Sequence, residues 1–121
     1  GVSDLSRTTV AAATIDELAQ RYRLNRVDVV KLDLEGAELR ALSGASATLS
    51  KHHPLLLVET AEEALRYQGG SCAALRSFLF EFGYRFLEFD RTTGEPTPLV
   101  GEMSSDTLIA IHSGRTFGLM A

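Results

Sequence analysis

The chain has 121 residues, of which 45% are hydrophobic and 23% are charged, and both fractions are close to those of an average globular domain. Its formal net charge of -4, without any run of basic residues, argues against a nucleic-acid backbone or an anionic membrane as partner. A single cysteine, Cys72, excludes an intrachain disulfide, and no apolar run approaches the roughly 18 residues of a membrane span. We therefore expect one cytoplasmic domain, or part of one, without nucleic-acid or membrane partners.

The first predicted helix begins at Thr14, whose hydroxyl can cap the helix while Glu17 completes a capping box. This helix is expected to extend from Ile15 to about Tyr22. It would bury Ile15 and Leu18, with Tyr22 as a further candidate. The residues before it, 1–13, are expected to be irregular.

The stretch 27–38 reads V-D-V-V-K-L-D-L-E-G-A-E and is the most informative part of the chain. Its aliphatic residues predict a strand: Val29, Val30, Leu32 and Leu34. Lys31, Asp33 and Glu35 fall two apart and would share one face of an extended segment. An acidic turn between a strand and a helix is a common ligand site, because ligands of α/β proteins lie at the carboxyl ends of parallel strands.

The remaining elements alternate between helices and strands. Gly36 ends the first strand, and the spacing of leucines then predicts one continuous helix over 37–49. Residues 55–59 consist of four apolar residues and then Glu59, and the unbroken apolar part is typical of an interior parallel strand that is covered on both faces. Further elements are expected as follows: a short helix at 61–67, a stronger helix at 71–82, a strand at 84–89, a loop at 91–105, a closing strand at 107–111 and an irregular tail at 113–121.

Helical connections make the first three strands parallel, whereas the last two, joined by a loop, are expected to be antiparallel. The predicted fold is therefore α/β, with a partial sheet of about four strands flanked by helices.

Three segments of the sequence together resemble one family. T-I-D-E-L, then V-D-V-V-K-L-D-L-E-G-A-E-L-R-A-L-S-G-A, then H-P-L-L-L-V-E are similar to the carboxyl half of an FkbM-type methyltransferase domain, over Thr14 to about Ile111. The resemblance implies a Rossmann-like class I sheet that binds S-adenosylmethionine. It also implies methyl transfer to a hydroxyl oxygen, commonly of a sugar or a secondary metabolite.

The same family holds its cofactor mainly on a glycine-rich turn that precedes the motif found here. No G-x-G-x-G or comparable loop occurs in the sequence. We therefore expect the isolated chain to lack activity, and the resemblance assigns no cofactor-binding residue.

Five ionisable residues are candidates for the site. Lys31 either faces a substrate oxygen or pairs with Asp33 or Glu59. Asp33 is the preferred base for a hydroxyl acceptor, although an acid at a strand end can also bind backbone amides. Glu35 either caps the next helix or contacts substrate or metal, and Glu38 is expected to be solvated. Glu59 would project to the same rim as Asp33 and orient substrate, and two such carboxylates could also bind a divalent cation.

A second hypothesis is a non-catalytic interaction module. The strand 27–34 would then form an exposed apolar edge through which the chain associates with itself. A phosphodiesterase barrel of the EAL type, in which a similar K-I-D strand occurs, is disfavoured because about 120 residues cannot close eight strands.

Overall fold

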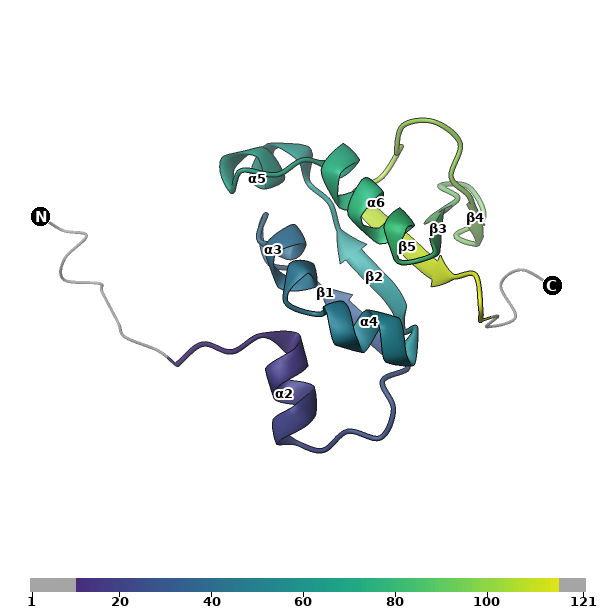
Figure 1. Cartoon of the computed structure of the whole chain (residues 1–121). Helices are drawn as coiled ribbons and strands as arrows, with labels where there is room; N and C mark the ends of the chain where they lie inside the picture. Colours follow the sequence, from purple (N-terminus) through teal and green to yellow (C-terminus); the bar gives the residue numbers. More distant parts are fainter. Residues whose placement is uncertain (1–10, 116–121) are drawn as a thin grey trace, which may run out of the picture.

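The computed structural model describes residues 11–115, so the expectations for 1–10 and 116–121 lie outside the described residues. Helices and strands alternate along the described chain (Figure 1). The elements are α2 (Ile15–Arg21), β1 (Val29–Leu32), α3 (Glu38–Ser43), α4 (Ser46–His52), β2 (Leu55–Glu59), α5 (Glu62–Tyr67), α6 (Cys72–Glu81), β3 (Tyr84–Phe89), β4 (Pro96–Pro98) and β5 (Thr107–His112).

The strands form one mixed sheet in the order β1-β2-β5-β3-β4. β1 and β2 are parallel, whereas β5 is antiparallel to both β2 and β3. The strands β1, β2 and β3 therefore run in one direction, and their carboxyl ends lie at the same edge of the sheet. This confirms the predicted α/β class and the antiparallel last pair.

The prediction that 91–105 is entirely a loop is wrong, because this segment contains β4, which pairs with β3. Two of the three residues of β4 are prolines, Pro96 and Pro98. Proline is tolerated there because a strand at the end of a sheet needs no N–H donor on its free side.

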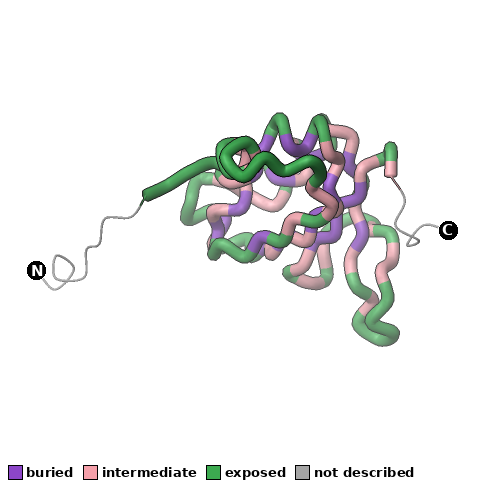
Figure 2. The backbone as a smooth tube through the Cα atoms, turned by 90° about the horizontal axis from the view of Figure 1, so that it is seen from below, coloured by how far each residue is buried: buried purple, intermediate pink, exposed green. Residues whose placement is uncertain are grey.

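The main core lies between the sheet and helices α3 to α6, and in Figure 2 the buried stretches occupy the middle of the fold. It joins buried helix residues to buried strand residues: Leu42, Leu49, Leu65, Leu75 and Leu79 with Leu56, Val58 and Leu108. The opposite face of the sheet carries a small cluster around Ile109, in which Leu55 and Leu57 remain partly exposed. Described helices contribute to only the first cluster, but Leu87, Ile109 and Ile111 in the second are also buried. The prediction that 55–59 is covered on both faces therefore stays a prediction.

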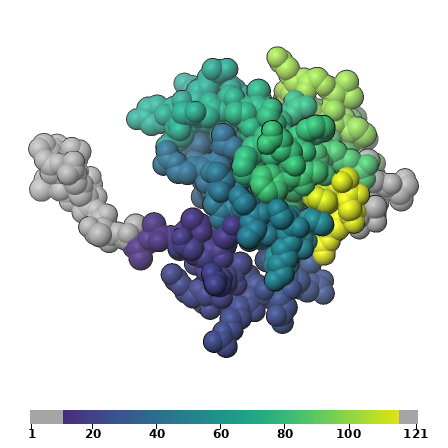
Figure 3. Space-filling view, viewed as in Figure 1, coloured from purple at the N-terminus to yellow at the C-terminus, as the bar shows by residue number. Residues whose placement is uncertain are grey.

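Helix α2 begins as predicted, since the Glu17 N–H donates to Thr14 Oγ1 at 3.0 Å. However, Leu18 is 39% and Tyr22 is 68% exposed, so the predicted burial of these side chains is wrong. In Figure 3 the purple part of the chain that contains the start of α2 lies at the edge of the molecule. Polar contacts through Asp16 attach α2 to α4 instead.

The Asp16 carboxylate caps α4, a helix whose own N-cap, Ala45, has no side-chain acceptor. It accepts hydrogen bonds from the N–H groups of Ala47 and Thr48, both at 2.9 Å, and from the Thr48 hydroxyl at 2.7 Å. Partial burial tends to raise the pKa of Asp16, but the hydrogen bonds outweigh it and lower the pKa. The charged carboxylate is thus the form that this contact favours.

The predicted continuous helix over 37–49 is wrong, because Gly44 and Ala45 separate α3 from α4. The Asp16 N–H donates to the Gly44 carbonyl at 3.0 Å, and a Cβ at Gly44 would lie only 3.0 Å from the Thr14 Cβ. The interruption therefore gives the start of α2 room to pack against the backbone.

Candidate functional site

The carboxyl edge of β1 and β2 brings together the two acids that the sequence placed on one rim. Leu32 pairs with Val58 at the end of the parallel register, and Asp33 and Glu59 are the next residues of the two strands. Asp33 is exposed. The Glu59 carboxylate is partly buried and accepts a hydrogen bond from the Thr107 hydroxyl at 2.9 Å. Glu59 is therefore held by β5, whereas Asp33 faces solvent.

Lys31 lies opposite Leu57 in β1 and is exposed. It forms no ion pair with any of residues 11–115, so the predicted pairing with Asp33 or Glu59 is not found. Its position on an edge strand explains this difference, because the ammonium group can reach water and needs no buried counterion.

The turn that follows β1 has a different geometry from the predicted extended one. Glu35 has a φ of 50° and Gly36 a φ of 103°, so the alternation of faces ends before Glu35. Glu35 is exposed and makes no capping bond to α3, whose N-cap is Ala37. The capping alternative for Glu35 is therefore wrong, and its carboxylate lies at the rim without a role in holding the turn.

Glu38 holds this turn instead. The residue is only 1% exposed, and its carboxylate accepts the N–H groups of Leu34 at 2.5 Å and of Gly36 at 2.9 Å. The prediction that Glu38 is solvated is thus wrong, because the turn directs two backbone donors inward and these donors require an acceptor. In the sequence, Glu38 follows Leu34 by four residues and Gly36 by two. This spacing of an acid after a turn is the signal that could have indicated the contact.

The turn is also packed against α5. A Cβ at Gly36 would lie 2.1 Å from the Ala64 carbonyl oxygen, so only glycine permits this approach. The acidic turn and α5 are consequently fixed relative to each other.

A polar pocket of about 480 Å³ lies beyond the end of β2, between the starts of α5 and α6 and the loop before β5. Its lining includes Thr60, Glu62, Arg66, Arg76 and Asp106. The Arg66 side chain lines this pocket, whereas Tyr67 beside it is strongly exposed. The other lining residues escaped the sequence analysis, since they come from segments that are far apart in the chain.

Hydrogen bonds determine the position of the pocket wall. Thr60 is buried, and both its N–H and its hydroxyl donate to the Asp106 carbonyl, at 2.6 and 3.0 Å. The Glu62 carboxylate accepts the Cys72 N–H at 3.0 Å and pairs with Arg66 at 2.9 Å. The wall is therefore built before any ligand binds.

The Cys72 thiol belongs to the same network and donates to the Thr60 carbonyl at 3.1 Å. Burial, and next the neighbouring Glu62 carboxylate, raise the pKa of Cys72 to about 11. The thiol is therefore protonated at neutral pH and acts as a donor, not as a thiolate nucleophile.

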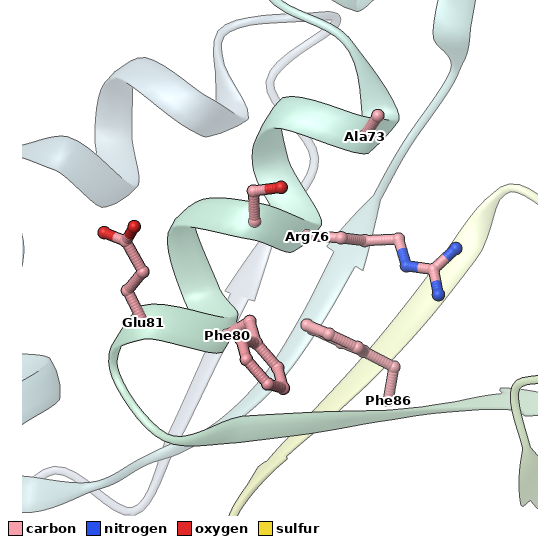
Figure 4. A pocket seen from close by; sticks show the side chains of 6 residues that line it. Ala73, Arg76, Phe80, Glu81 and Phe86 are labelled. Carbon is pink, nitrogen blue, oxygen red and sulfur yellow. The ribbon is translucent and has the colours of Figure 1, made fainter.

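A second hollow, of about 450 Å³, lies between α6 and β3 (Figure 4). Phe80 and Phe86 border it from the two elements, and Arg76 passes above Phe86, with the guanidinium carbon 5.5 Å from the ring centroid. The hollow is lined mainly by apolar surface, in contrast to the pocket at the end of β2.

Neither a cluster of metal-ligating side chains nor a membrane-spanning helix is found in the described part of the chain. Among residues 11–115, no group of three or more His, Cys, Asp or Glu side chains could hold a metal ion. The longest helix in this part of the chain, α6, has ten residues, too few to cross a bilayer.

The fold and the site define a mixed α/β domain with an acidic rim and a prebuilt pocket at the carboxyl edge of its parallel strands. The family model described as the methyltransferase FkbM domain matches residues 2–86, and the chain belongs to this family. The family predicted from the sequence is thereby confirmed, and with it methyl transfer as the general activity. Comparisons with curated proteins and with solved structures gave no match.

Proposed function

We propose that this chain serves the transfer of a methyl group from S-adenosylmethionine to a hydroxyl oxygen of a sugar or a secondary metabolite. The observation that carries the proposal is the exposure of Asp33 and Glu35 at the carboxyl edge of β1, in a chain of the FkbM family. We further propose that the sheet belongs to a Rossmann-like class I domain.

The described residues fit one side of a site for this cofactor. S-adenosylmethionine supplies an electrophilic methyl group on a cationic sulfonium, and exposed carboxylates such as Asp33 and Glu35 attract a cation. Within residues 11–115 no glycine-rich turn connects a strand to a helix, so the residues that would hold the adenosine are left unassigned.

In the proposed reaction Asp33 acts as the base. Its carboxylate would accept the proton of the acceptor hydroxyl as the oxygen forms its new bond to the methyl carbon. Glu35 would add negative charge on the cofactor side, and Lys31, exposed on the same strand, would face the acceptor oxygen. Glu59, fixed by the Thr107 hydroxyl, would orient the acceptor.

Replacing the proposed base tests this function. We expect Asp33→Asn to lower methyl transfer about a hundredfold or more, because general base catalysis is worth that much. Because the isolated chain is expected to lack activity, the measurement uses the chain joined to a cofactor-binding half that supplies the family's glycine-rich turn. It follows the label from methyl-labelled S-adenosylmethionine into neutral hydroxylated acceptors. Glu63→Gln, an equally exposed acid on α5, is the control and should retain its rate. Equal rates for the two variants would refute the role of Asp33.

A second candidate function is self-association through β1. Within the described sheet β1 is a terminal strand, and Val29 is 53% exposed on it. Such edges pair readily with another strand, and the proposed occupant is a second copy of the chain. Sedimentation velocity should then reveal a concentration-dependent dimer that Val29→Lys weakens about tenfold, whereas Val100→Lys, at an exposed loop position, leaves it unchanged. A monomer at every concentration would overturn this candidate.

A further inference from the structure

The polar pocket beyond β2 and the apolar hollow between α6 and β3 share two lining residues, Ala73 and Arg76. They therefore adjoin each other along α6, and we term the two together the α6 groove. We propose that this groove binds a neutral amphiphilic compound, with its hydroxylated end in the polar pocket and a planar apolar body against Phe80 and Phe86. The inference goes beyond the proposed function, because neither Asp33 nor Glu59 lines either part of the groove.

The charges of the polar end favour a neutral ligand. Three acids, Glu62, Glu102 and Asp106, and two bases, Arg66 and Arg76, line it. Because the acids outnumber the bases, a phosphate or another polyanion would be repelled. Carboxylates accept and guanidinium groups donate hydrogen bonds, so together they match a ligand whose hydroxyls do both.

The polar end is also preorganised. The Glu62 carboxylate is held by the Cys72 N–H and by Arg66, and the Arg76 guanidinium donates to the Gly101 carbonyl at 2.9 Å. A ligand that enters this pocket does not need to order these side chains, which reduces the entropic cost of binding.

The apolar end is marked by Phe80, which is 70% exposed although it lies on a helix with a buried face. In Figure 4 Phe80 and Phe86 both border the hollow below α6. A planar apolar body placed there would cover the Phe80 ring and contact Phe86, and the Arg76 guanidinium beside the rings would add a cation–π contact. Aromatic surface of this kind is typical of small-molecule sites.

One wall of the groove lies outside the part of the chain that the family model matches. Glu102, Met103, Ser105 and Asp106 line the polar end, and all four lie beyond residues 2–86, which the family model matches. Hydrogen bonds from Thr60 to the Asp106 carbonyl and from Arg76 to the Gly101 carbonyl hold the backbone of the loop that carries them. We therefore assign the selection of the ligand's hydroxylated end to this loop.

Binding of simple probes tests the groove without any cofactor. Three neutral probes are compared by chemical-shift titration: 4-nitrophenyl glucoside carries both parts, methyl glucoside only the hydroxylated part, and 4-nitroanisole only the aromatic part. We expect the aryl glucoside to bind at least about tenfold more tightly than either single part. Equal affinity of the aryl glucoside and methyl glucoside would overturn the proposal.

Matched variants locate the two ends of the ligand. Phe80→Ser should weaken the aryl glucoside about tenfold and leave methyl glucoside unchanged, whereas Glu62→Gln should weaken both glucosides. Tyr67→Ser removes another strongly exposed aromatic ring, outside the groove, and should change neither affinity. A loss with Tyr67→Ser as large as with Phe80→Ser would refute the groove.

Discussion

Replacing Gly36 with alanine should destabilise the protein by about 3 kcal/mol or more. The backbone at Gly36 has a φ of 103°, a conformation that L residues rarely adopt. In addition, the new Cβ would lie 2.1 Å from the Ala64 carbonyl oxygen, which belongs to the backbone of α5 and cannot rotate away. Either the acidic turn or the helix must move. Urea unfolding monitored by circular dichroism measures the loss.

Gly69→Ala is the matched control for this prediction. Gly69 also has a positive φ, of 87°, but no atom lies within 4 Å of the position of its Cβ. This variant should therefore lose only the conformational part, about 1 kcal/mol. If the two variants lost equal stability, the collision with Ala64 would not be the reason for glycine at position 36.

The second large effect is expected for Glu38→Ala, with a loss of about 3 kcal/mol in the free energy of unfolding. The Glu38 carboxylate is buried and accepts two backbone N–H groups of the turn. Its removal leaves the donors of Leu34 and Gly36 without their acceptor and also creates a small cavity. Thermal and urea unfolding of the variant measure the effect.

Glu38→Gln keeps one oxygen acceptor and nearly the same volume, so it should lose less than Glu38→Ala. Glu63→Ala removes an exposed glutamate and should stay within about 0.5 kcal/mol of the original chain. A loss for Glu38→Ala as small as that of Glu63→Ala would contradict a structural role of the buried carboxylate.

The strands were predictable because their signal is local. The mainly apolar segments 55–59 and 107–111 indicate strands that need burial. A helical connection between two strands makes them parallel, so Asp33 and Glu59 could be placed at the same edge of the sheet. The K-L-D-L-E-G-A-E motif indicated the family for the same reason, since it is contiguous in the sequence.

The roles of individual acids were harder to predict. Both Glu35 and Glu38 are acids beside a helix start, and sequence spacing does not reveal which of them turns inward. The left-handed backbone at Glu35 directs its side chain to solvent, while the inward N–H groups of the turn recruit Glu38. Likewise, Asp16 lies in the first turn of α2 but caps α4, which begins thirty residues later.

The sequence by itself determined the family, the α/β class and the acidic edge of β1, because these depend on contiguous motifs and on hydrophobic periodicity. Only the tertiary structure decided that helices cover one face of the described sheet, that Glu38 is buried, and that α6 lines a groove. The physical reason is that pockets and buried acceptors arise between segments distant in the chain. Thr60, Arg76 and Asp106 meet only when β2, α6 and the loop before β5 have packed together.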